Sequence, residues 1–155
     1  MIHTYRYGSE REEGEGLRIG VARQVPRGVK KEEWQRRGYF DIRAPALAPS
    51  MELVGEYRHG HIGFEEFARR YRKEMKSEAS RELIEFLASM ALYQPISLGC
   101  FCENESGCHR SLLREILTRE ATEKAALFHS LKKEKGDTDS RRFASPVCLA
   151  DFSKD

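Results

Sequence analysis

Three cysteines, a histidine and an arginine gather within eleven residues of this chain, at Cys100, Cys102, Cys108, His109 and Arg110. An apolar run ends at Cys102, a polar loop follows, and an amphipathic pattern starts at Cys108. That order predicts a strand, a loop and a helix start, which places these side chains beside free backbone N–H groups. Helix N-termini attract anions and lower the pKa of thiols. This segment is therefore the candidate site.

The spacing also predicts how the side chains point. Residues two apart on a strand share a face, so Cys100 and Cys102 are expected on the same side. Cys108 is expected in the first turn of the helix, where the dipole favours a thiolate. A cation such as Arg110 loses about 0.3–1 kcal/mol at this end of a helix unless an anion compensates. That anion is either a nearby carboxylate, Glu103 or Glu105, or a bound phosphate.

Four interpretations of the segment remain open. In the first, Arg110 and backbone N–H groups hold a phosphate and His109 contacts the ligand. In the second, a thiol activated by histidine acts as a nucleophile, so the candidate catalytic residues are Cys102, Cys108 and His109. In the third, zinc is held by Cys100, Cys102, Cys108 and His109, although the spacing lacks the usual C-x2-C knuckle. In the fourth, the segment only packs, because free cysteine is often part of a core.

A basic stretch covers residues 16–31 and contains no carboxylate. Its cations are Arg18, Arg23, Arg27, Lys30 and Lys31. It is either a solvated face that pairs with the glutamates of residues 10–15 or one wall of an anion site. The formal net charge of +2 is too small to support a nucleic-acid partner by itself.

Hydrophobic periodicity predicts an α/β layered domain. Strands are expected at residues 2–7, 17–25, 38–43 and 96–102, and helices at 30–37, 50–60, 64–76, 78–93 and from 108 through 128. Ser50 is the expected N-cap of the second of these helices. Residues 1–130 should form one domain, and residues 131–155 a C-terminal loop or docked tail.

Length and composition set further bounds. A chain of 155 residues favours a single domain. No apolar stretch approaches the roughly 20 residues of a membrane span, and the N-terminus lacks a signal-peptide layout. We therefore expect a cytoplasmic protein without a membrane partner. Four cysteines in such a chain argue against a disulfide framework.

Several motifs occur in a fixed order along most of the chain, from Tyr5 to Leu117. They are Val25-Pro-Arg-Gly-Val-Lys30, Leu47-Ala-Pro-Ser50-Met-Glu-Leu53, Phe67-x-x-x-Tyr71-x-x-Glu74, and Cys102-Glu103 followed by Cys108-His109-Arg110. With them the chain resembles the domain of unknown function 488 family. It departs from many relatives at Val25, where they carry tryptophan.

The resemblance implies a three-layer, Rossmann-like α/β sandwich with a small, mostly parallel sheet. It brings no established activity, but it implies that Arg27, Lys30 and Arg110 face a common cleft. The expected function is thus binding of a nucleotide or other phosphate-containing anion, with Glu103 orienting Arg110. A metal-stabilised or nucleic-acid-associated module and a purely structural motif are the alternatives.

The ligand-binding candidates are Arg27, Lys30, Tyr71, Glu103 and Arg110. Tyr71 belongs among them because its hydroxyl needs a partner, although packing in the core is the alternative. No cofactor and no oligomeric state follow from the sequence, and whether the protein catalyses a reaction stays open.

Overall fold

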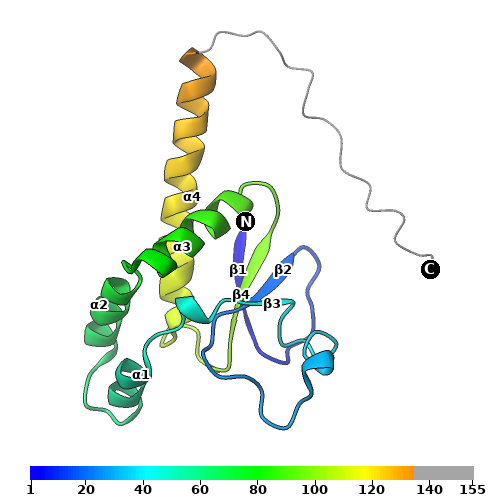
Figure 1. The fold of residues 1–155 in the computed structure, drawn as a ribbon, viewed down its shortest axis with the longest axis vertical. Coiled ribbons are helices and arrows are strands. Elements are labelled where there is room, and N and C mark those ends of the chain that lie inside the picture. The colour runs from blue at the N-terminus through cyan, green and yellow to red at the C-terminus, as the bar shows by residue number, and fades with distance from the viewer. Residues whose placement is uncertain (135–155) are drawn as a thin grey trace, which may run out of the picture.

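A four-stranded parallel sheet forms the centre of the protein in the computed structural model, which describes residues 1–134 and the side chains of residues 1–131. The strands are β1 (Ile2–Arg6), β2 (Leu17–Gly20), β3 (Ile42–Arg43) and β4 (Ile96–Cys100). Their order is β1-β4-β2-β3, and every neighbouring pair is parallel (Figure 1). The last strand of residues 1–134 thus lies between the first two.

The central strand β4 is buried on both faces, as a strand in a covered parallel sheet must be. Its one hydroxyl is satisfied, because Ser97 Oγ donates to the carbonyl of Glu15 at 2.6 Å. Gly99 allows a close approach of the neighbouring strand. A Cβ at this position would lie 2.2 Å from the ring of Tyr5, so only glycine fits there.

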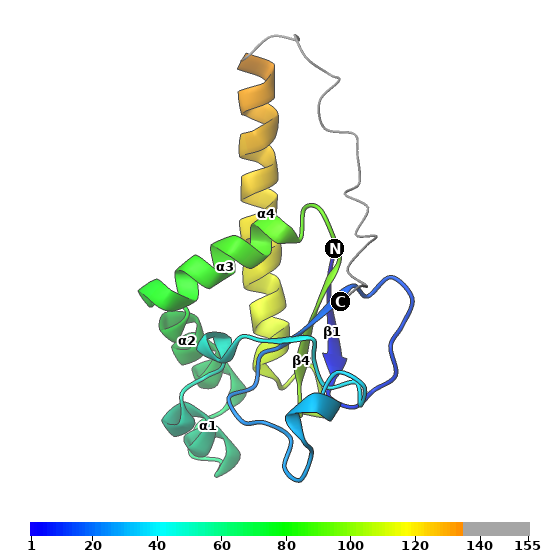
Figure 2. The same cartoon turned by 45° about the vertical axis from the view of Figure 1, so that its right-hand side comes forward.

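Four helices lie on one side of the sheet (Figure 2), where α4 packs on β1 and β4, α2 and α3 pack on α4, and α1 packs on α2. They are α1 (Met51–Arg58), α2 (Phe64–Glu74), α3 (Glu78–Met90) and α4 (His109–Glu134). Strand residues such as Ile96 and Leu98 share one core cluster with Leu113 and Leu117 of α4. This apolar layer fixes the start of α4 beside the end of β4.

The other face of the sheet is covered by loops and by the 3-10 turn η1 (Lys31–Glu33) rather than by helices. Phe40 packs there against Tyr7, with 5.5 Å between ring centroids, and against Trp34, at 5.1 Å. The Tyr5 hydroxyl donates to the carbonyl of Tyr39 at 2.5 Å. The protein is therefore a mixed α/β Rossmann-like sandwich, as the resemblance implied.

Arg18 of β2 lies fully buried under this loop layer. Its guanidinium pairs with Glu15, donates to the carbonyls of Ser9 and Gly38 at 2.8 Å each, and sits 4.4 Å from the ring centroid of Tyr5. Gly38 has a φ of 71°, and a Cβ there would lie 2.7 Å from the Ser9 carbonyl. Arg18 consequently belongs to the core and not to the wall of an anion site.

The expected elements are present with altered lengths. The strands are shorter than expected, and residues 30–37 form only the turn η1, while a second turn, η2, spans Pro45–Leu47. Ser50 is the N-cap of α1, as expected, because its Oγ accepts from the N–H of Leu53 at 3.2 Å. Helix α4 runs through Glu134, past the boundary at residue 131, and residues 135–155, with Cys148, lie outside the described part.

No helix within residues 1–134 is both long and apolar enough to cross a membrane.

Candidate functional site

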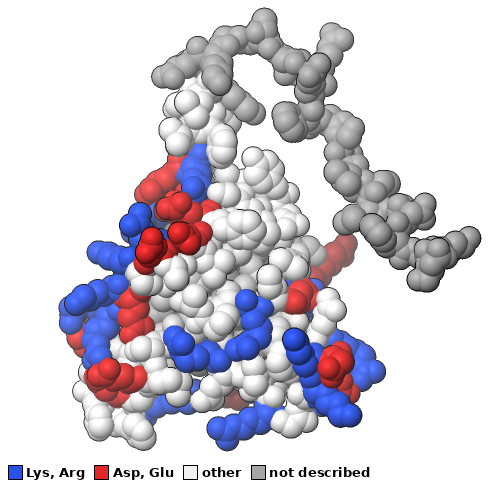
Figure 3. Space-filling model, in the orientation of Figure 1, with Lys and Arg blue, Asp and Glu red and all other residues white. Residues whose placement is uncertain are grey.

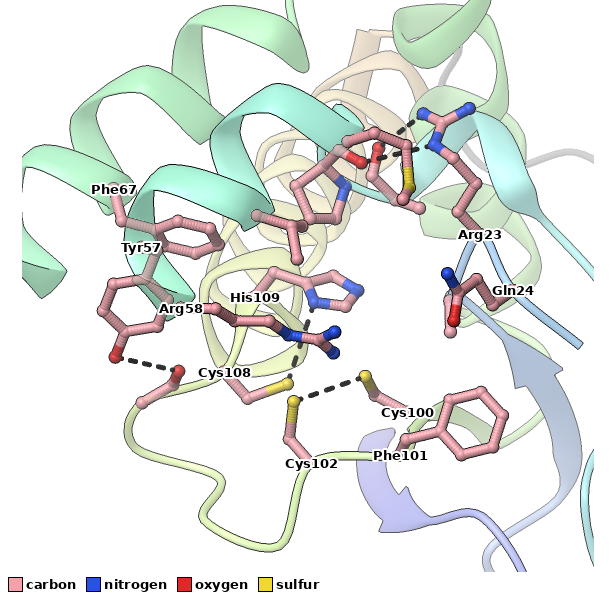
Figure 4. Close-up of a pocket in the computed structure, with 16 residues that line it drawn as sticks. Arg23, Gln24, Tyr57, Arg58, Phe67, Cys100, Phe101, Cys102, Cys108 and His109 are labelled. Atoms are coloured by element: carbon pink, nitrogen blue, oxygen red, sulfur yellow. Dashed lines mark hydrogen bonds between the residues drawn. The ribbon is translucent and has the colours of Figure 1, made fainter. Parts of the chain in front are cut away.

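A pocket opens where the carboxyl ends of β2 and β4 meet the N-terminus of α4 (Figure 4). This is the usual ligand position in an open parallel sheet. The cavity has a volume of about 180 Å³. It is lined by the segment after β2, by α1, by Phe67 of α2 and by the loop from β4 to α4. Its thiol-bearing floor consists of Cys100, Cys102 and Cys108.

The three sulfur atoms of this floor form one cluster. All lie within 4.8 Å of one another, and Cys100 Sγ and Cys102 Sγ are 3.7 Å apart. Cys100 and Cys108 are buried, whereas Cys102 is partly exposed. The expectation that Cys100 and Cys102 point the same way is met, and the helix start brings Cys108 to them across five intervening residues.

The proximity of the thiols separates their pKa values. Hydrogen bonds from Cys100 and then Cys108 hold the pKa of Cys102 well below its usual range, and the charge of Arg110 adds to this. The hydrogen bond to Cys102 raises the pKa of Cys100. Hydrogen bonding to Cys100 and Cys102, together with burial, raises the pKa of Cys108. Of the three thiols, the partly exposed Cys102 therefore favours the thiolate form most.

His109 is buried behind the thiols, and its orientation fixes its tautomer. Nε2 lies 2.9 Å from the carbonyl oxygen of Val21, which can only accept, so Nε2 carries the proton. Nδ1 is thereby left as an acceptor, 3.8 Å from Cys108 Sγ. Burial lowers the pKa of His109 against the opposing effect of the Val21 carbonyl. The neutral imidazole therefore turns its unprotonated Nδ1, a hydrogen-bond acceptor, toward the sulfur of Cys108.

Arg110 does not face the pocket. It is buried, and its Nη1 donates to the carbonyls of Cys102 at 2.8 Å and Tyr5 at 3.2 Å, while Nη2 donates to the Glu103 carbonyl at 3.4 Å. The Glu103 carboxylate pairs instead with exposed Arg6 at 2.9 Å. The expected pairing of the Glu103 carboxylate with Arg110 is therefore not formed, because backbone carbonyls at the strand ends take the guanidinium. Arg110 positions the backbone that carries Cys102.

Two other arginines border the pocket. Arg58, at the end of α1, points over the sulfurs in Figure 4, and within residues 1–134 it has no ion pair or side-chain hydrogen bond. Arg23 stands on the opposite side and donates to the carbonyls of Pro49 at 3.3 Å and Ala48 at 3.2 Å. Sequence reasoning placed Arg23 only in a basic stretch and missed Arg58. The only sequence signal for Arg58 was its position at the end of a helix with no glutamate one turn earlier to pair with it. That position has an ordinary explanation too, because cations stabilise the negative end of the helix dipole.

The other expected ligand residues lie elsewhere. Arg27 and Lys30 are exposed and do not line the pocket, so the structure does not bring them to Arg110. Tyr71 is fully buried, donates to the Leu47 carbonyl at 2.7 Å, and packs edge-on against His109 with 5.7 Å between centroids. Tyr71 is thus a core residue that supports the imidazole from behind.

Fold and site together define a Rossmann-like α/β protein with a thiol-floored pocket at the carboxyl ends of its strands. The chain belongs to the DUF488-N3a family, whose model, described as the active DUF488-N3 subclade, matches residues 2–121. Uncharacterized proteins of Mycobacterium bovis and Mycobacterium tuberculosis are 29% identical to it over 103 residues, which cover 66% of this chain and 81% of each relative. No solved structure matches the chain significantly.

Proposed function

We propose that the pocket binds a small phosphate-containing anion, such as a nucleotide or a related phosphate compound. The observation that carries this proposal is Arg58, whose guanidinium points into the pocket and has no partner among the described residues. Guanidinium groups form strong, bidentate hydrogen bonds with phosphate oxygens. An unpaired guanidinium beside a concave surface can therefore bind a phosphate group.

The remainder of the pocket supports a ligand with an apolar part. Met51 and Val54 of α1 line the pocket. The ring of Phe67 lies at one side of it, and Phe101 and Arg23 lie at the other (Figure 4). Apolar walls with a few polar groups are typical of small-molecule sites. A cavity of about 180 Å³ suits a phosphate ester or one end of a nucleotide rather than a large ligand.

The charge on the surrounding surface favours the same class of ligand. Figure 3 shows Lys and Arg side chains gathered between α1 and the segment that follows β2, with few acidic side chains among them. Cations around a concave site raise the local concentration of anions. The attraction acts on any phosphate compound, so the pocket itself must supply selectivity.

The test compares AMP, adenosine and inorganic phosphate by isothermal titration calorimetry on the full chain under reducing conditions. We expect AMP to bind at least tenfold more tightly than adenosine. Arg58→Gln should lower the AMP affinity at least tenfold. Arg81→Gln is the matched control, because Arg81 is an exposed arginine of α3 outside the pocket.

Arg27→Gln distinguishes binding in this pocket from binding in the cleft of Arg27, Lys30 and Arg110 that the resemblance implies. Because Arg27 does not line the pocket, its substitution should weaken AMP binding less than Arg58→Gln does. Equal affinity for AMP in wild type and Arg58→Gln, or equal affinity for AMP and adenosine, would overturn the proposal.

A further inference from the structure

We propose that Cys100, Cys102 and Cys108 bind a zinc ion whose fourth coordination position faces the pocket. This metal site rests on the sulfur cluster alone and does not depend on anion binding by Arg58. Thiolates are soft ligands that select zinc among the common divalent cations. Three protein ligands with one open position are the arrangement of a zinc ion that also takes a water molecule or a ligand.

The distances fit the coordination of zinc. A Zn–S bond of about 2.3 Å in tetrahedral geometry places neighbouring sulfurs about 3.8 Å apart. Cys100 Sγ and Cys102 Sγ are separated by 3.7 Å, and all three sulfurs lie within 4.8 Å of one another. Closing the triangle around an ion requires only small rotations of the side chains. In residues 1–134 no other set of three metal-ligating side chains is as close.

The loop between the ligands is held in a definite conformation. Arg110 fixes the carbonyl of Cys102 at 2.8 Å. The side chain of Asn104 accepts from the N–H of Ser106 at 3.0 Å, and the N–H of Cys108 donates to the carbonyl of Glu105 at 3.0 Å. These hydrogen bonds hold the backbone that carries the three sulfurs, so the ligands approach an ion from a fixed loop.

His109 belongs to the surroundings of the ion rather than to its three thiolate ligands. Its Nδ1 is 3.8 Å from Cys108 Sγ but does not lie within 4.8 Å of all three sulfurs. The hydrogen bond from Nε2 to Val21 holds the ring in this place. The fourth position is consequently left to the pocket, where Arg58 and the apolar wall stand.

If the proposed function holds, the ion and Arg58 act on one ligand from two sides. The ligand oxygen would occupy the fourth position of the ion, and the guanidinium would bind other oxygens of the same phosphate. This part of the inference rests on the proposed function, whereas the three-thiolate site does not.

The experiment titrates the reduced, metal-free full chain with Co²⁺ and then with Zn²⁺. One Co²⁺ per chain should produce thiolate charge-transfer absorption, and Zn²⁺ should abolish it by displacement. Cys100→Ser, Cys102→Ser and Cys108→Ser should each lower the Zn²⁺ affinity at least tenfold. Cys148→Ser, the same substitution at the remaining cysteine of the chain, should bind Zn²⁺ like the wild type.

A second measurement uses the unaltered protein, so that a variant that fails to fold cannot decide the outcome. Zn²⁺ should protect Cys100, Cys102 and Cys108 from alkylation by iodoacetamide, as read by peptide mass spectrometry. Arg58→Gln should keep one Zn²⁺ per chain even where it loses AMP, which distinguishes this inference from the proposed function. Absence of thiolate absorption in the reduced wild type, unprotected thiols in the presence of Zn²⁺, or loss of Zn²⁺ binding in Cys148→Ser would overturn the site.

Discussion

The carboxylate of Glu74, at the end of α2, accepts two hydrogen bonds from Ser50, the N-cap of α1. Its Oε2 lies 2.9 Å from the backbone nitrogen of Ser50, and its Oε1 lies 2.5 Å from the hydroxyl. Arg70, four residues before Glu74 on the same helix, pairs with Glu56 of α1. One carboxylate therefore holds the start of the helix that carries Arg58, although it does not line the pocket.

Glu74→Gln should destabilise the protein by about 1.5–3 kcal/mol, because it removes charge-assisted hydrogen bonds to a partly buried cap. Urea unfolding followed by circular dichroism measures the change in the free energy of unfolding. Glu66→Gln is the control on the same helix. Glu66 forms an exposed ion pair with Arg69, whose loss should cost less than about 1 kcal/mol. Equal losses in the two variants would contradict the assignment.

Arg18→Met should be among the most damaging single substitutions. It leaves the largely buried carboxylate of Glu15 and several carbonyl oxygens without their donor. Breaking a buried ion pair from one side typically costs about 3–5 kcal/mol. Arg72→Met, which removes an exposed pair with Glu115, should cost less than about 1 kcal/mol in the same chemical-unfolding assay.

Acid should destabilise the protein through Glu15 and Asp41. Burial acts against the charged form of each, but hydrogen bonds from Arg18 to Glu15 and from Arg11 to Asp41 outweigh it, so both pKa values lie below their usual range. A carboxyl whose pKa is lower in the folded state stabilises the fold above its unfolded pKa of about 4, and loses that effect as the pH falls.

The free energy of unfolding should therefore decline from about pH 5 to pH 3. Urea unfolding at a series of pH values measures this slope. Asp41→Asn removes one of the two groups and should flatten the decline while lowering stability at neutral pH. An unchanged slope in Asp41→Asn would show that other groups cause the acid sensitivity.

Arg110→Met should reduce stability rather than abolish anion binding directly. The variant leaves the carbonyls of Tyr5, Cys102 and Glu103 without the guanidinium they now share. Several hydrogen bonds to one buried charge are lost, so a cost of about 3 kcal/mol or more is expected. Thermal unfolding and AMP titration at a temperature where the variant is folded separate the two effects. A stable Arg110→Met variant that no longer binds AMP would contradict this structural role and indicate that Arg110 contacts the ligand.

The sequence predicted the layers of the fold well, because they follow from local patterns. The alternation around Ile2 and Leu17 and the apolar run that starts at Ile96 specified three strands, and Ser50 specified the start of a helix. The strand also predicted that Cys100 and Cys102 point the same way, and only the zinc interpretation brought Cys108 to them. The strand order within the sheet depends on pairings up to 94 residues apart, such as Ile2 with Ile96, which no local pattern carries.

The roles of the arginines were the main feature that the sequence could not predict. Arg18 and Arg110 turn inward because carbonyl groups from distant segments converge on them, in one case across 105 residues. Arg58 faces the pocket because α1 packs over the loop that carries the thiols, with Tyr57 Oη donating to the Gly107 carbonyl at 3.4 Å. A cation looks the same in a sequence whether it meets backbone, carboxylate or an empty pocket.

The position of β4 between β1 and β2 has a consequence for synthesis on the ribosome. Strands β1 and β2 do not pair with each other, because β4 lies between them. β2 ends at Gly20, whereas β4 begins only at Ile96. At translation rates of about 5–20 residues per second, the nascent chain exposes these strands for roughly 4–15 seconds before their shared neighbour is made. The strand that completes the sheet also ends at Cys100, with Cys102 and Cys108 close behind it, so the nascent protein acquires its hydrogen-bonded framework and its cluster of thiols at the same late stage.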